Sequence, residues 1–129
     1  MDFSSEMIRR AHAKTEQVVP KPVFIVGDAA KPPLTARSFD AVLSRHVLWA
    51  MPDPGAALGN WIELLTPTGV LILIEGRWHT GAGLTADECL RLVSGGAGAR
   101  SAPCAGRPVL LWCAHPRREV PDHQRGVTR

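Results

Sequence analysis

The feature that most constrains this chain is an unbroken apolar run, VLILI, at residues 70–74. Its length suits one strand, and a strand without polar alternation is typical of a sheet that is covered on both faces. A second run, FDAVLS at 39–44, precedes it, and between the two Asp53 and Pro54 form a helix-start signal. The order strand, helix, strand predicts an α/β fold.

The N-terminal part adds a helix and a short strand to this pattern. Apolar residues recur at helical spacing over 4–18, and Pro20 and Pro22 end the helix that they predict. The run VFIV at 23–26, closed by Gly27, predicts a buried strand. This strand would precede the one at 39–44.

The C-terminal part contains clear local signals. TPTG at 66–69 predicts a turn before the central strand. Thr85 and Glu88 have the spacing of a capping box, which predicts a helix that ends near Val93. The run VLLWC at 109–113 predicts a last strand.

The size of the chain, 129 residues, fits one domain with a real core. Apolar residues make up 45% and charged residues 21%, which excludes wholesale disorder. We expect a folded domain over 1–113 and a basic, disordered tail over 114–129. The tail's arginines are not interleaved with aromatic residues, so we do not expect nucleic-acid binding.

The cysteines and the N-terminus predict a cytoplasmic protein. Cys89, Cys104 and Cys113 are an odd number without C-x-x-C spacing, which favours a reduced compartment. The first residues lack the apolar core of a signal peptide, and no run approaches the roughly 20 apolar residues of a membrane helix. We therefore expect no membrane association.

Polar residues follow the ends of the predicted strands. Asp28 follows the run at 23–26, while Ser44, Arg45 and His46 close or follow the run at 39–44. Ligands of open α/β sheets bind at the carboxyl ends of the strands. Asp2 stands where another strand would end, and its carboxylate could accept hydrogen bonds from a ribose diol. The pattern predicts a nucleoside site.

Three segments carry a family resemblance: DFSSEMIRRAHAK at 2–14, the stretch from VGDAAK to DPGAAL at 26–58, and LLTPTGVLILIEGRW at 64–78. In their order and spacing they resemble the class I S-adenosylmethionine-dependent methyltransferases, particularly methyltransferase type 11. The resemblance implies a Rossmann-like sheet with flanking helices, the cofactor S-adenosyl-L-methionine and a small-molecule methyl acceptor. Residues 1–113 would then be a partial methyltransferase domain.

The resemblance assigns the adenosine end of the cofactor to two segments. Asp2 looks like the acidic residue that holds the ribose, and Phe3 stands beside it in the expected cofactor set. Asp28 and Ala29 look like the pair that contacts the adenine. Taken alone, Asp2 could simply favour a helix start and Asp28 could simply form a turn.

The resemblance assigns the reacting end to the residues that follow the next strand. Ser44 and Arg45 match positions that line the methionine part of the cofactor. His46 is the candidate general base for a hydroxyl or amine acceptor, although it could equally cap or pack. The reaction requires no metal, because the cofactor supplies the electrophile.

The chain begins after the family's glycine-rich motif, so we expect a truncated sheet that lacks its first two strands. Three outcomes follow for the exposed strand edges: pairing of 23–26 with 39–44, self-association, or partial disorder of 1–35. The function is therefore expected to be methyl transfer to an unidentified small molecule, with loss of this activity through truncation as an open alternative. The alternatives are a non-catalytic remnant that binds cofactor weakly or not at all, and a basic nucleic-acid-binding module.

Overall fold

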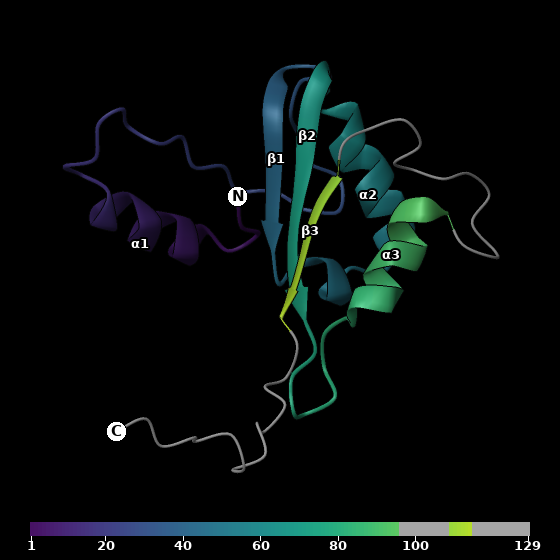
Figure 1. Cartoon of the computed structure of the whole chain (residues 1–129). Helices are drawn as coiled ribbons and strands as arrows, with labels where there is room; N and C mark the ends of the chain where they lie inside the picture. Colours follow the sequence, from purple (N-terminus) through teal and green to yellow (C-terminus); the bar gives the residue numbers. More distant parts are fainter. Residues whose placement is uncertain (96–108, 115–129) are drawn as a thin grey trace, which may run out of the picture.

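A three-stranded parallel sheet forms the centre of the protein (Figure 1). The computed structural model describes residues 1–95 and 109–114. The strands are β1 (Phe39–Arg45), β2 (Leu65–Gly76) and β3 (Val109–Ala114), in the order β1-β2-β3. Both strand pairs are parallel, so the predicted α/β class is confirmed.

Two helices connect the strands and cover one face of the sheet (Figure 1). Helix α2 (Pro54–Glu63) and the short 3-10 helix η1 (Leu48–Ala50) lie between β1 and β2, and α3 (Ala86–Ser94) follows β2. Between these helices and the sheet lies a core of aliphatic side chains and one tryptophan. The core residues are Leu48, Ala57, Leu58, Trp61, Ile62, Leu65, Leu71 and Leu73.

The opposite face of the sheet is not covered by a helix in the described part of the chain. Leu43, Ile72 and Leu110 are register partners across the three strands and form a row, which we call the open row. Leu43 is 62% exposed and Leu110 is 60% exposed. Ile72 and Ile74 of the central strand are half-buried on this face, so the expected cover on both faces is incomplete in the described part of the chain. Helix α1 (Ser5–Lys14) lies apart from the sheet instead (Figure 1).

The caps that the sequence predicts are present at α2 and α3. Asp53 Oδ1 accepts a hydrogen bond from the Ala56 amide at 2.9 Å, and Pro54 occupies the first turn. The Thr85–Glu88 capping box forms in both directions, at 3.2 Å and 2.7 Å. These local contacts explain why both helices begin where the sequence predicts.

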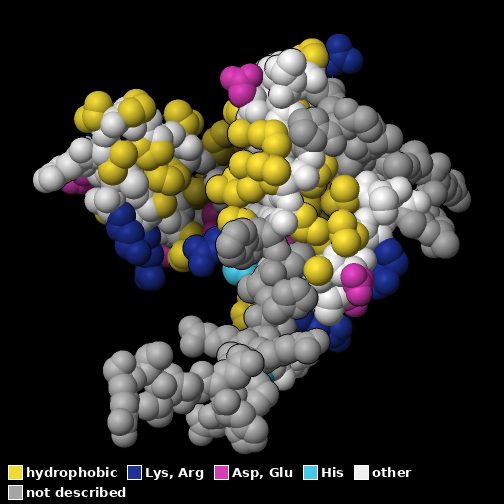
Figure 2. Space-filling view, in the orientation of Figure 1, with side chains coloured by type: hydrophobic (Ala, Val, Ile, Leu, Met, Phe, Trp, Pro, Cys, Tyr) yellow, Lys and Arg dark blue, Asp and Glu magenta, His cyan; other side chains and the backbone are white. Residues whose placement is uncertain are grey.

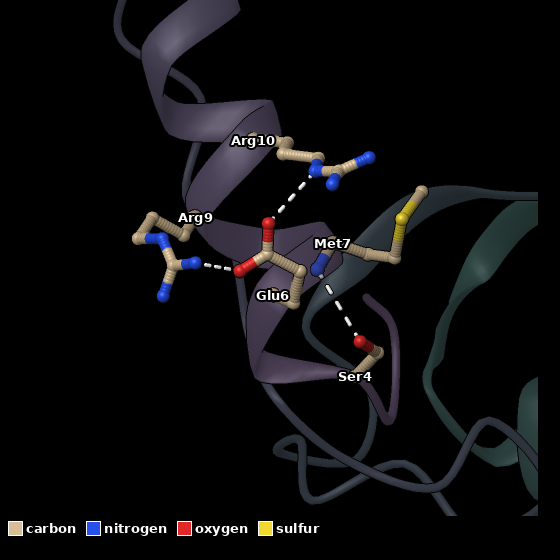
Figure 3. Close-up of polar contacts among 5 residues, drawn as sticks. All are labelled: Ser4, Glu6, Met7, Arg9 and Arg10. Carbon is tan, nitrogen blue, oxygen red and sulfur yellow. Dashed lines mark hydrogen bonds and ion pairs between the residues drawn. The ribbon is translucent and has the colours of Figure 1, made fainter.

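Helix α1 is shorter than the predicted helix over 4–18. It begins after Ser4, whose hydroxyl accepts the Met7 amide at 3.3 Å (Figure 3). It ends at Lys14, where the Thr15 hydroxyl turns back to the Ala11 carbonyl at 3.0 Å. Glu6 forms ion pairs with both following arginines of the helix (Figure 3). No residue of α1 is buried, so the helix is stabilised by these surface contacts and by the His12 ring, whose centre lies 4.8 Å from that of Phe24.

The predicted strand at 23–26 is wrong. Only Val26 is paired, in an isolated parallel bridge with Asp2. The Asp2 amide donates to the Ile25 carbonyl at 3.2 Å, and the Gly27 amide donates to the Asp2 carbonyl at 3.0 Å. Pairing of 23–26 with β1 does not occur, because β2 is the one strand partner of β1 in the described residues. Self-association and partial disorder of 1–35 stay predictions.

The segment 66–69, which was predicted to be a turn before the central strand, lies inside β2. The pairing of β2 with β1 is irregular there. The register changes from Phe39 opposite Leu65 to Ala41 opposite Val70, so β2 contains extra residues here. Gly69 makes this possible, since a Cβ there would lie only 2.9 Å from the Phe39 carbonyl oxygen.

Two further expectations concern the ends of the chain and the membrane. The predicted tail falls almost entirely on 115–129, which lies outside the described residues. Within the described ranges, no helix combines the length and the apolar character needed to cross a bilayer.

Candidate functional site

The bridge between Asp2 and Val26 brings two acidic residues from distant parts of the sequence near each other. Asp2 lies opposite Val26, and Asp28 follows two residues later. Asp2 Oδ1 accepts the Ser4 amide at 2.8 Å, and Asp28 Oδ1 accepts the Ala30 amide at 2.8 Å. These local bonds fix the orientation of each carboxylate, and they are the contacts expected of a helix start and of a turn.

A cavity of about 320 Å³ lies along the outer edge of β1. Ala29, Ser44 and Arg45 line it together, so three of the seven predicted site residues share one cavity. Its other walls are mostly apolar, and Met1 and Trp61 contribute to them. An apolar hollow with a few polar groups is the usual form of a small-molecule site.

The other four predicted residues do not line this cavity. Met1, the residue before Asp2, does line the cavity. The Phe3 side chain is 86% exposed and Asp28 is exposed as well. His46 lies on the turn just beyond β1. The predicted set is therefore divided between the cavity and its surroundings.

Helix α2 fixes the loop that carries Ala29. The Trp61 indole N–H donates to the Ala29 carbonyl at 2.7 Å, and the Asn60 side chain donates to the Ala30 carbonyl at 2.8 Å. Trp61 is 4% exposed and belongs to the core. The core thus anchors one wall of the cavity.

The turn after β1 places His46 among aromatic rings. Its φ of +54° lies in the left-handed region, and its amide donates to the Ile74 carbonyl at 2.8 Å. The ring lies 5.0 Å from that of Trp78, which is 5.6 Å from that of Trp49. The Trp49 indole N–H donates to the His46 carbonyl at 3.1 Å. These contacts match the packing interpretation of His46.

Glu75 is a residue of this region that the sequence reasoning missed. It stands near the carboxyl end of β2 and is fully buried. Its Oε1 accepts the Val47 amide at 3.2 Å and the Leu48 amide at 2.9 Å, so it ties β2 to the turn after β1. An acidic residue at the end of an apolar strand was the available signal, because strand ends form the ligand edge of such sheets.

Three polar atoms near these strand ends are buried and have no hydrogen-bond partner within the described residues. They are Ser44 Oγ, His46 Nδ1 and Glu75 Oε2. Buried polar groups are normally paired, so unpaired ones are candidates for functional roles. No group of three or more metal-ligating side chains occurs in the described ranges.

Comparison with known proteins identifies relatives of the N-terminal half. A family profile described as a methyltransferase domain, type 11, matches residues 1–73. The highly reducing polyketide synthase pkhB of Emericella nidulans is 36% identical over 76 residues, which is 56% of this chain and 3% of the synthase. The chain therefore spans a very small part of that relative. No solved structure matches the chain significantly.

Proposed function

The chain belongs to the methyltransferase domain family, and from this premise we propose that it binds S-adenosyl-L-methionine at the carboxyl ends of its strands. The parallel sheet with helices between its strands is consistent with a partial Rossmann-like methyltransferase domain. The proposed reaction is methyl transfer to a small molecule.

The observation that carries the proposal is the cavity shared by Ala29, Ser44 and Arg45 beside the outer edge of β1. The residues that line it come from two loops or strand ends that are distant in sequence, as in other ligand sites of α/β sheets. Asp2 and Asp28 lie near its Ala29 side. We assign the cofactor's ribose to Asp2, with Phe3 beside it, and its adenine to Asp28 and Ala29.

The cofactor would supply a methyl group on a positively charged sulfur, so the protein's task is to hold donor and acceptor in line. Ser44 and Arg45 would hold the methionine part. His46 would accept a proton from a hydroxyl or amine acceptor. Because His46 Nδ1 is buried, Nε2 is the nitrogen assigned to this role.

A non-catalytic remnant that binds cofactor weakly or not at all is the second candidate. Two observations favour it: the outer edge of β1 has no strand partner in the described part of the chain, and Phe3 is 86% exposed. A site with one open wall holds a ligand less well than a closed one.

Calorimetric titration with S-adenosylhomocysteine distinguishes the two candidates. We expect measurable binding by the wild-type protein. Asp28→Ala should weaken it about tenfold or more, because a hydrogen bond to a charged group contributes about 1.5–3 kcal/mol. The matched control is Asp40→Asn. Asp40 is an exposed carboxylate at the start of β1, whereas Ser44 and Arg45 lie at the other end of that strand. Wild-type protein that does not bind would contradict the proposal.

A further inference from the structure

Glu75 is an unusual feature of the candidate site, because it is a fully buried acidic side chain. Its Oε1 accepts two backbone amides, whereas Oε2 has no partner within the described residues. No lysine or arginine of the described ranges forms an ion pair with it; the ion pairs found there involve Glu6 and Glu88. Its negative charge is therefore only partly compensated by the protein.

The hydrogen bonds of Glu75 place its carboxylate beside the turn that follows β1. His46 donates its amide to Ile74, the residue before Glu75, and Val47 and Leu48 donate theirs to Glu75 itself. The carboxylate thus lies directly under the turn that continues from Ser44 and Arg45. Whatever is bound at the cavity end formed by those two residues lies in its electric field.

Arg45 acts in the opposite sense, because its guanidinium is a positive group lining the same cavity. Its side chain is exposed, so solvent and salt screen its charge. Glu75 is shielded from solvent, and its field is screened much less. The field of Glu75 therefore persists at the turn, whereas that of Arg45 is weakened by screening.

We propose that Glu75 is a positioning residue that makes the site prefer the positively charged sulfonium form of the cofactor to its uncharged thioether product. This inference rests on the proposed function. The two ligands have nearly the same shape and differ by the methyl group and one unit of charge. A buried negative charge near the sulfur therefore changes the affinity for one of them and leaves that for the other nearly unchanged.

The expected effect is large enough to measure. At an effective dielectric constant of about 20, two unit charges separated by roughly 8–15 Å interact by about 1–2 kcal/mol, which is roughly six- to thirtyfold in affinity. A purely structural role of Glu75 would change both affinities by the same factor. The ratio of the two affinities is therefore the diagnostic quantity.

The test is calorimetric titration of the full chain with S-adenosylmethionine, the cationic analogue sinefungin and S-adenosylhomocysteine. Glu75→Gln keeps an oxygen that can accept the Val47 and Leu48 amides but removes the charge. We expect it to bind the two cations about tenfold more weakly and the thioether within about twofold of wild type. Glu63→Gln, at the C-terminal end of α2, is the matched control and should change neither affinity.

Glu75→Met is a second variant in case Glu75→Gln does not fold: it removes the charge together with the unpaired Oε2, although the Val47 and Leu48 amides then lose their acceptor. It should show the same selective loss. If wild-type protein binds neither ligand type, the proposed function fails and this inference with it. If wild type binds both and the affinity ratio is unchanged in a folded variant, the inference alone is overturned.

Discussion

At the residue scale, the clearest electrostatic effect is at the start of α3. The pKa of Glu88 is lowered from its usual value of 4.5, first by its hydrogen bonds with the backbone and side chain of Thr85. The positive charges of Arg77 and Arg91 lower it further, and partial desolvation opposes them. The carboxylate therefore stabilises the folded state only when it is ionised.

The sign of the resulting pH dependence follows from the lowered pKa. The contribution of Glu88 is fully present above pH 4.5 and is lost as the pH falls through the folded-state pKa. We expect the Glu88→Gln variant to lose less stability than the wild-type protein as the pH falls. Thermal melting of both proteins between about pH 3 and pH 7 measures it. Equal pH dependence in the two proteins would contradict the prediction.

At the element scale, the sequence predicted the elements whose signals are local. Asp53 with Pro54 and Thr85 with Glu88 define helix starts by contacts within one turn, and both helices begin there. A strand depends on a partner elsewhere, and the run at 23–26 has one only at Val26. The same limit applies to the site, since burial of Glu75 depends on elements that local patterns do not reveal.

The connection from β2 to α3 depends on a glycine. Gly83 has a φ of +96° and forms a bridge with Arg77. An added Cβ would collide with the Gly76 carbonyl oxygen and would lie 2.8 Å from the Trp78 ring. We expect Gly83→Ala to lower the free energy of unfolding by about 1–3 kcal/mol. Chemical denaturation measures this change.

Gly59 is the matched control for that substitution. It lies within α2, and nothing stands within 4 Å of the place where its Cβ would be. Gly59→Ala should leave the free energy of unfolding unchanged or raise it by up to about 1 kcal/mol. Equal effects of the two substitutions would show that the close approach at Gly83 does not constrain the loop.

At the scale of the whole molecule, the main feature is that one face and one edge of the sheet are uncovered in the described part of the chain. Parallel sheets are usually covered on both faces, and unpaired edges invite association. Here the open row is exposed at Leu43 and Leu110, and β1 has a free outer edge in the described part of the chain. Figure 2 shows hydrophobic side chains gathered over β1 and β2 and over α1.

We therefore expect the protein to self-associate in a concentration-dependent manner. Leu43→Lys places a charge in the open row beside the β1 edge and should shift the equilibrium toward monomer. Leu90→Lys is the matched control, because Leu90 is 53% exposed but lies on α3. Light scattering coupled to size-exclusion chromatography measures the mass. A wild-type protein that remains monomeric at high micromolar concentration would contradict this expectation.

The order of the strands also bears on how the chain reaches this structure. Neighbouring strands of the sheet are also consecutive in the sequence, with η1 and α2 between β1 and β2 and with α3 between β2 and β3. Folding therefore closes only loops of modest length, and the entropy lost at each closure is small. None of the strand pairs of the sheet includes residues 1–38. The sheet can therefore nucleate before the N-terminal helix forms, because that helix has no buried side chain to contribute to the nucleus.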